Sequence, residues 1–361
     1  MENVQSDSTK ILGFGRAGDM KSACMEFEPG DVLYGRLRPY LNKVCSPSIG
    51  GLASAEFITF RDFEAIYPGF LKYLLNQPEF VTFANRLNEG DRPRVKWSQI
   101  QTFEFPLPPF DQQQGIVEAI EEQFSRLDAG VESLQRAKRN LTRLRGAAVR
   151  SLVDATWPTV SLGNAGDVVG GITKDSQRES RSDAIEIPYL RVANVQRGYL
   201  DLSEVKTIRA PAAKIKTLLL EPGDVLLTEG GDRDKLGRGW VWRGELDRCI
   251  HQNHIFRARL DRTRFIPEFV SVYANHFGQQ WFDRMGKQTT NLASISLTNL
   301  RKFPVPAPSI EDQERVLAEV ERQFSIIDAM AKTIDAGLQR AGALRQSILS
   351  QAFSGRLTGT T

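Results

Sequence analysis

Several features that often identify a protein class are absent from this chain of 361 residues. No apolar run approaches the roughly 18–20 residues that a helix needs to cross a bilayer, and the polar N-terminus lacks the apolar core of a signal peptide. The sequence contains only three cysteines, Cys24, Cys45 and Cys249, and their wide spacing argues against a disulfide framework. We therefore expect a cytoplasmic protein with no membrane partner.

A strong excess of charge is also missing. The formal net charge is +3, with 25% charged and 41% hydrophobic residues, which is ordinary for a soluble globular protein long enough for two domains. Nucleic-acid binding therefore cannot be inferred from the total charge and has to rest on local clusters of cations.

The chain lacks a complete catalytic or nucleotide-binding motif. The segment Gly13–Gly18 matches GxGxxG, but Pro29-Gly30 follows before a full helix could form, so we interpret the segment as a turn. Leu107 precedes Pro108-Pro109-Phe110 at the position where an amino-methyltransferase needs a polar acceptor for its target amine. Methylation would therefore have to come from a partner.

One cluster, Cys249, His251 and His254, has the spacing of metal ligands. The matching stretch of the first half of the chain, Ser54–Phe57, contains neither Cys nor His, which excludes a zinc site shared by both halves. We prefer alternation along a strand to a metal site and expect no bound metal.

The sequence repeats itself over a long distance. When the chain is shifted against itself by 200 positions without gaps, identical residues coincide over some fifty positions, which chance does not produce. The coinciding residues of the first half are Phe103, Pro106, Pro108, Gln113, Glu121, Gln123-Phe124-Ser125, Asp128-Ala129 and Leu144-Arg145.

Further upstream the repeat continues with a different offset, as loops of unequal length require. Glu28–Leu33 recurs as Glu221–Leu226, and Asn3-Val4-Gln5 matches Asn194-Val195-Gln196. In each half, short β-type runs precede a helix and a stiff, proline-rich connector. The predicted strands are Asp31–Leu37, Phe57–Phe60, Tyr189–Val195, Asp224–Thr228 and His254–Leu260, and the predicted helices are Pro68–Asn85 and Pro267–Met285.

After each connector, apolar residues recur at alternating spacings of four and three, the period of a coiled-coil seam. Each predicted helix holds about forty residues and would be roughly 60 Å long. Arg145 and Arg345 occupy the same seam position, where they could extend into solvent or fix the register of the two helices. The seam residues assigned to helix pairing or partner binding are Phe124, Leu127, Leu134, Arg145, Phe324, Ile327, Ile334 and Arg345.

These features together resemble the specificity subunits of type I restriction–modification systems. The resemblance covers essentially the whole chain and rests on two diverged units, the Phe-Pro-x-Pro type connectors, the repeated Gln-Phe-Ser-x-x-Asp of the helices, and the closing segment Gln351–Leu357. It implies an α+β fold with two target-recognition domains, mixed β-sheets with helices, separated by two long antiparallel coiled-coil helices. The expected division is 1–109, 110–153, 154–309 and 310–361, with the first domain short at its N-terminus.

The resemblance also implies a function. Each domain would recognise one half of a bipartite, asymmetric double-stranded DNA site, and the helices would bind two modification (methyltransferase) subunits and the restriction/translocase subunits. The chain would not be an enzyme, and S-adenosylmethionine, ATP and Mg²⁺ would be bound by the partner subunits only. The alternatives are a degenerate or partial specificity subunit that mainly docks the methyltransferase, and a self-sufficient adenine methyltransferase, which the missing acceptor motif disfavours.

The candidate DNA-binding residues lie in polar loops that contain cations. Arginine suits guanine, asparagine suits adenine, and lysine mostly contacts phosphate. Any single one of these residues could equally be part of a solvated surface loop. The candidates are Arg36, Arg38, Arg92, Arg94, Lys96, Lys174, Arg191, Asn194, Arg197, Arg233, Lys235, Arg238, Lys287, Thr289, Thr290 and Asn291.

The two halves differ at their beginnings. If Asn3-Val4-Gln5 corresponds to Asn194-Val195-Gln196, the opening of the second half, the 37 residues Trp157–Ala193, has no counterpart in the first. A sheet without its first strand would have an exposed edge and a reduced core. We expect either that the natural protein starts further upstream or that the first domain leans on the helices or on a partner.

Overall fold

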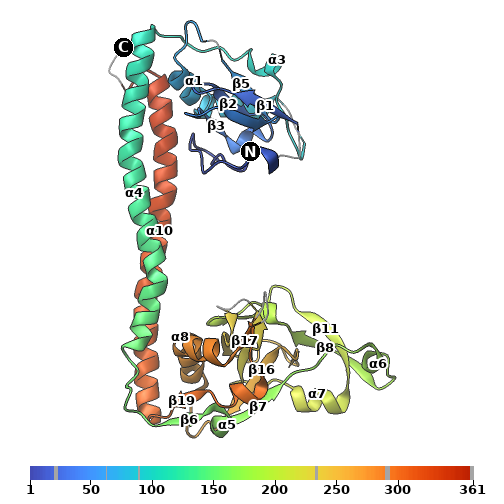
Figure 1. The fold of residues 1–361 in the computed structure, drawn as a ribbon. Coiled ribbons are helices and arrows are strands. Elements are labelled where there is room, and N and C mark those ends of the chain that lie inside the picture. The colour runs from blue at the N-terminus through green and yellow to red at the C-terminus, as the bar shows by residue number, and fades with distance from the viewer. Residues whose placement is uncertain (20–22, 62, 88–89, 232–234, 289–292, 358–361) are drawn as a thin grey trace. The chain divides into compact units, whose positions relative to one another are not determined.

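The computed structural model describes residues 1–361 except 20–22, 62, 88–89, 232–234, 289–292 and 358–361. The chain forms two compact units, and each is described here by itself. Unit 1 comprises Met1–Lys138 together with Lys332–Thr361, and unit 2 comprises Arg139–Ala331 (Figure 1). Each unit therefore contains a globular part and one part of each of two long helices.

The central sheet of unit 1 is antiparallel, with the strand order β3-β2-β5. A tight turn precedes β2, because Gly30 adopts a positive φ of 91° and the Asp31 carboxylate accepts a hydrogen bond from the Glu28 amide. All four residues of β2 are buried. The elements of the globular part are β1 (Cys24–Phe27), β2 (Val32–Gly35), β3 (Val44–Cys45), β4 (Gly51–Ser54), β5 (Phe57–Phe60), α1 (Pro68–Leu74), α2 (Pro78–Arg86) and α3 (Trp97–Ile100).

Unit 2 is built in the same way around a larger sheet with the order β14-β12-β16-β7. The same turn precedes β12, with Gly223 at a φ of 98° and Asp224 accepting from the Glu221 amide. The elements are β6 (Thr159–Ser161), α5 (Leu162–Ala165), β7 (Gly166–Gly170), α6 (Ser176–Glu179), β8 (Ala184–Leu190), β9 (Val195–Gln196), β10 (Tyr199–Leu200), β11 (Lys206–Pro211), α7 (Ala212–Leu218), β12 (Val225–Thr228), β13 (Gly230–Gly231), β14 (Gly239–Val241), β15 (Ile250–His251), β16 (Ile255–Leu260), α8 (Pro267–Met285), β17 (Lys287–Gln288), β18 (Ala293–Ser294), α9 (Leu297–Leu300) and β19 (Pro304–Pro306).

Two of the predicted elements are wrong in detail. The helix predicted over Pro68–Asn85 is broken into α1 and α2, because Pro78 has no amide hydrogen and holds the preceding residue in an extended conformation. The strand predicted over Tyr189–Val195 is also interrupted. β8 ends at Leu190, and the Asn194 side chain accepts a hydrogen bond from the Arg191 amide, which closes a 3₁₀ turn before β9.

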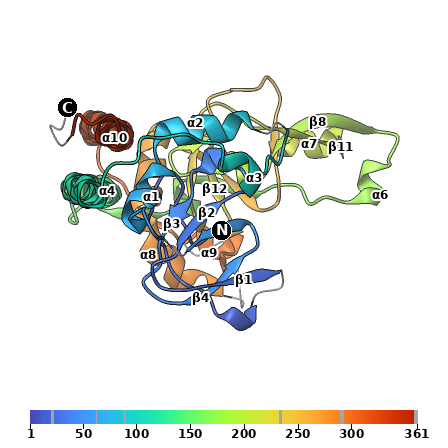
Figure 2. The same cartoon turned by 90° about the horizontal axis from the view of Figure 1, so that it is seen from above.

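The long helices are α4 (Phe110–Arg150) and α10 (Ile310–Phe353), which run antiparallel and side by side (Figures 1 and 2). Their seam residues enter the core of each unit. In unit 1, Ile120 and Phe124 of α4 pack in one cluster with Ile348 of α10 and the globular part. In unit 2, Val149 of α4 joins Val316 and Val320 of α10 in the same way. Among the described residues, no helix has the length and apolarity that a bilayer-spanning segment requires.

A buried glutamine joins each long helix to its globular part. Gln113 accepts a hydrogen bond from the Tyr67 amide at 2.7 Å and donates to the carbonyls of Ala65 and Pro108. Gln313 makes the same three kinds of bond in unit 2, to the Ile266 amide and to the Arg264 and Pro308 carbonyls. Both side chains are fully buried, so this joint explains why glutamine recurs at the 200-residue offset.

Candidate nucleic-acid interface

In unit 1, the structure brings the two candidate loops together. The Arg38 amide donates to the Pro93 carbonyl at 2.8 Å, and Leu37 and Arg94 form an isolated β-bridge. The loop after β2, with Arg36 and Arg38, therefore lies beside the segment 92–96 that leads into α3. Arg36 and Arg38 are half-buried, whereas Arg92, Arg94 and Lys96 are exposed.

The Arg94 side chain is paired with a carboxylate. Its guanidinium donates twice to the carboxylate of Glu56, with Nε 3.1 Å from Oε2. These hydrogen bonds raise the pKa of the Arg94 side chain. Glu56 directly precedes β5, so the ion pair joins the end of the sheet to the candidate loop.

In unit 2, the loop at 191–197 lies next to the loop at 235–238. Arg238 donates to the carbonyl of Val192, and the Gly198 amide donates to the carbonyl of Gly239. Arg197 reaches α8, where it donates to the Asn275 carbonyl and to Gln279. The Arg197 and Arg238 side chains are thus hydrogen-bonded within unit 2, which limits the orientations that they can adopt toward a ligand.

Asn194 has an internal position. Only 2% of its surface is exposed, and its amide donates to the carbonyls of Asp201 and Glu204. An adenine contact would require these bonds to break, so the geometry assigns Asn194 to the 3₁₀ turn rather than to the surface.

The remaining candidate DNA-binding residues do not form one group, and some of them lie outside the described residues. Lys174 is exposed on the loop after β7, and Lys287 lies in β17. The backbone at Gly171, just before Lys174, packs so closely that a Cβ there would lie 2.0 Å from the His251 carbonyl oxygen. Arg233, Thr289, Thr290 and Asn291 lie outside the described residues.

The seam arginines reach across to the opposite helix. In unit 2, Arg145 of α4 forms an ion pair with Asp328 of α10 and lies over the Phe324 ring. In unit 1 the roles are exchanged, because Arg345 of α10 pairs with Asp128 of α4 and lies 4.0 Å from the centre of the Phe124 ring. This reciprocal pattern matches a fixed register between the helices and not extension into solvent.

The three residues of the Cys-x-His-x-x-His segment have different surroundings. Cys249 and His251 are buried, and His251 Nδ1 lies 2.8 Å from the Ile255 carbonyl oxygen. Burial lowers the pKa of His251 to about 4. His254 is exposed instead, and its Nδ1 lies 2.6 Å from the carboxylate of Glu229.

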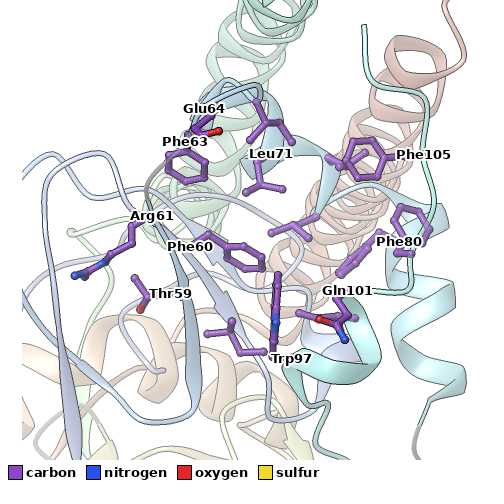
Figure 3. Close-up of a pocket in the computed structure, with 16 residues that line it drawn as sticks. Thr59, Phe60, Arg61, Phe63, Glu64, Leu71, Phe80, Trp97, Gln101 and Phe105 are labelled. Atoms are coloured by element: carbon purple, nitrogen blue, oxygen red, sulfur yellow. The ribbon is translucent and has the colours of Figure 1, made fainter.

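Unit 1 also contains an apolar hollow of about 670 Å³ beside β5 (Figure 3). Phe60, Trp97 and Phe105 line it, together with residues of α1 and α2. Among the described residues, β5 pairs with β2 alone, whereas its counterpart β16 in unit 2 pairs with both β12 and β7. The hollow thus lies beside the strand whose counterpart in unit 2 is paired on its second side with β7.

The aromatic residues near this edge of β5 are less buried than their counterparts in unit 2. In unit 2, Phe303 is 1% exposed and Val305 is fully buried, since β19 pairs with β6. The corresponding Phe103 and Phe105 of unit 1 are only half-buried. β5 is thus an edge strand of the described sheet, and its surroundings are less buried than those of β16. That the first domain is short at its N-terminus stays a prediction.

Sequence reasoning did not select the acidic partners of the candidate cations. Glu56 and Glu229 were not singled out, and His254 was considered only as part of a metal motif. The sequence does contain a signal: Glu56 and Glu229 directly flank predicted strands and His254 begins one, and side chains at strand ends emerge at the end of a sheet.

No protein-family model matches the chain. Among curated proteins, the specificity subunit of the type I restriction enzyme EcoKI from Escherichia coli K12 is 22% identical over 316 residues, covering 82% of this chain and 67% of that protein. The StySPI specificity subunit from Salmonella potsdam is 24% identical over 307 residues, covering 81% of this chain and 66% of its own length. The chain thus spans about two thirds of the length of the curated relatives it matches.

Solved structures show the same fold. A chain from a structural study of complex assembly and conformational transition of the type I R-M system superimposes with a TM-score of 0.74 at 20% identity, covering 98% of this chain and 90% of that one. The HsdS subunit from Thermoanaerobacter tengcongensis gives a TM-score of 0.56 at 20% identity, with 98% and 89% coverage. The predicted α+β fold with two long antiparallel helices is confirmed. In both sequence and fold, the chain is a homologue of the specificity subunits of type I restriction enzymes.

Proposed function

We propose that this chain is the DNA specificity subunit of a type I restriction–modification complex and that its two units recognise the two halves of a bipartite, asymmetric DNA target. The observation that carries the proposal is a repeated scaffold with different exposed side chains. Gln113 and Gln313 make equivalent bonds inside the two units. The polar groups at the ends of the central strands differ between the units, as two domains that recognise different bases require.

The candidate loops have the chemistry of DNA contacts. In unit 1, Arg92 and Lys96 are exposed beside Arg94, and such cations bind phosphates and position a protein on the duplex. Base selection requires directed hydrogen bonds, and the Arg94 guanidinium, oriented by Glu56, is suited to them. In unit 2, Lys174, Lys235 and Arg238 are the corresponding candidates.

In this proposal the chain itself is not catalytic. Two modification subunits and the restriction/translocase subunits bind the helices, and they supply S-adenosylmethionine, ATP and Mg²⁺. The helices offer matching apolar positions for this role. Leu144 of α4 is 46% exposed and Leu344 of α10 is 51% exposed, and the two occupy the same place in the repeat.

A second function also has an observation in its favour. A partial specificity subunit would dock the methyltransferase but recognise DNA poorly, and the hollow beside β5 supports this alternative because unit 1 has the smaller core. In that case only one half-site would be recognised well.

Co-expression with the modification subunit of a type I restriction–modification system, followed by affinity purification and mapping of methylated bases in the host genome, tests the proposal. We expect a stable complex and methylation at a split target with two different halves. Co-purification with methylation at a single short motif would favour the partial subunit. Methylation by this chain without any partner would contradict the proposal.

A further inference from the structure

The two central sheets can be superimposed residue by residue from their strand register. In unit 1, Gly35 at the end of β2 pairs with Phe57 at the start of β5. In unit 2, Thr228 at the end of β12 pairs with Ile255 at the start of β16. Gly35 therefore corresponds to Thr228, and Phe57 corresponds to Ile255.

The next residue pair along these strands is held by the same backbone hydrogen bond in both units. The Arg36 amide donates to the Glu56 carbonyl at 2.9 Å, and the Glu229 amide donates to the His254 carbonyl at 2.9 Å. Arg36 thus occupies the place of Glu229, and Glu56 occupies the place of His254.

A third segment completes this corner in each unit. The Val95 amide donates to the Arg36 carbonyl, and the Ile295 amide donates to the Glu229 carbonyl. Arg94 and Ser294 precede these residues, so they correspond to each other at the 200-residue offset. We call this place the strand-end corner: Arg36, Glu56 and Arg94 in unit 1, and Glu229, His254 and Ser294 in unit 2.

The backbone of the corner is the same in both units, but its side chains are not. Unit 1 has a carboxylate after β4, on Glu56, bonded to Arg94. Unit 2 has a carboxylate on the other strand, on Glu229, with His254 Nδ1 at 2.6 Å. The side chains of Glu56 and Glu229 are each 27% exposed, and those of Arg94 and His254 are about half exposed.

The opposite ends of the same strands do not vary in this way. Asp31 and Asp224 both close the turn before the central strand. Arg61 bonds to Asp31, and Arg259 bonds to Asp224, so the salt bridge is retained as well. The ion pair at this end is therefore retained between the units, whereas the charged groups at the end that carries the candidate loops differ.

We propose that the strand-end corner reads one base pair in each half-site. In unit 1, Arg94 oriented by Glu56 selects guanine, whose O6 and N7 suit a guanidinium. In unit 2, the Glu229 carboxylate selects a base that presents an amino group in the major groove, as cytosine and adenine do. His254 supports Glu229, because its Nδ1 lies 2.6 Å from the Glu229 carboxylate. A hydrogen bond donated to the carboxylate there reduces the repulsion between this carboxylate and nearby DNA phosphates. This inference rests on the proposed function.

The test uses the full chain assembled with its methyltransferase and a library of random-sequence DNA duplexes, from which bound DNA is recovered and sequenced. For Glu229→Gln we expect discrimination at one position of one half-site to fall on the order of 10- to 100-fold. A triple variant, Glu229→Arg with His254→Glu and Ser294→Arg, transfers the corner of unit 1 to unit 2. It should gain a preference for guanine at that same position.

The unaltered half-site serves as an internal control, because it shows that the variant folds, assembles and binds DNA. The matched control substitution is Asp247→Asn, which changes an exposed carboxylate of the same unit outside the corner and the long helices and should change no base preference. Unchanged preferences for Glu229→Gln, or equal weakening on all sequences, would overturn the inference while leaving the proposed function intact. A wild-type complex with no sequence preference would overturn the proposed function itself.

Discussion

At the scale of single residues, the repeated glutamine shows how a structural role preserves a side chain. Gln113 and Gln313 each satisfy one backbone amide and two carbonyls at the joint between a globular part and a long helix. No shorter side chain can reach all three groups, and a buried backbone group without a partner is costly. The seam arginines follow the same logic, since each needs an aspartate and an aromatic ring on the opposite helix.

This role predicts a large effect on stability. The substitution Gln113→Ala should lower the free energy of unfolding of unit 1 by about 2–4 kcal/mol, because the Tyr67 amide and two carbonyls lose their partner in a buried place. Urea unfolding measures the change. The neighbouring Gln114 is exposed, and Gln114→Ala should cost less than about 0.5 kcal/mol. Equal effects of the two substitutions would contradict the role of the joint.

A second prediction at this scale concerns the pH dependence of the free energy of unfolding. Burial lowers the pKa of His251 to about 4 in the folded chain, from an ordinary value of 6.5. Between these values the unfolded chain binds more protons, so the free energy of unfolding falls as the pH drops from 6.5 towards 4. His251 alone should account for a loss of about 3 kcal/mol between pH 7 and pH 4. Urea unfolding of His251→Asn should show a pH dependence that is smaller by this amount, and an unchanged slope would refute the assignment.

At the scale of elements, the periodic patterns of the sequence correctly predict the features that depend on residues close together in the chain. Most of the coiled-coil seam was predicted correctly, because apolar side chains at spacings of four and three return to one face of any helix. The strand Phe57–Phe60 and the helix Pro267–Met285 were predicted with the bounds that the structure gives. The break of the predicted helix at Pro78 is not predicted, because the apolar periodicity continues through this position. The periodicity of side chains carries no information about the backbone amide hydrogen that proline lacks.

The exposed edge of unit 1 leads to a prediction about local stability. Amides of β5 should exchange with solvent faster than those of β16, because β16 lies between two strands and β5 pairs with only β2 in the described structure. Hydrogen exchange followed by mass spectrometry measures this. The inner strands β2 and β12 provide the control and should be similarly protected. Equal protection of β5 and β16 would mean that the first domain is complete and that the repeat boundary is wrong.

At the scale of the whole molecule, the two units share one scaffold and two helices. Both helices contribute to the core of both units, through Ile120 and Ile348 in unit 1 and through Val149 and Val320 in unit 2. Under the proposed function, the helices set the separation of the two half-sites, as a fixed spacing between DNA-binding domains does elsewhere.

Lengthening both helices tests this role. Inserting one heptad into Leu134–Leu144 and one into Ile334–Leu344 adds about 10.5 Å, which corresponds to roughly three base pairs. The non-specific gap of the target should lengthen by that amount while both half-sites keep their bases, and methylation mapping would show it. A heptad in only one helix would mismatch the seam, and we expect it to abolish assembly. Altered half-site bases with an unchanged gap would show that the helices do not determine the spacing.

The sequence by itself determined the repeat, the seam of the long helices and the resemblance to specificity subunits, because these features depend on residues a few positions apart or on direct comparison of the two halves. Only the tertiary structure decided which loops meet. The approach of Arg36 to Val95, the pairing of Glu229 with His254 and the burial of Asn194 depend on contacts between distant segments. Local patterns do not specify such partners, since the pairing of strands is selected by the packing of the whole unit.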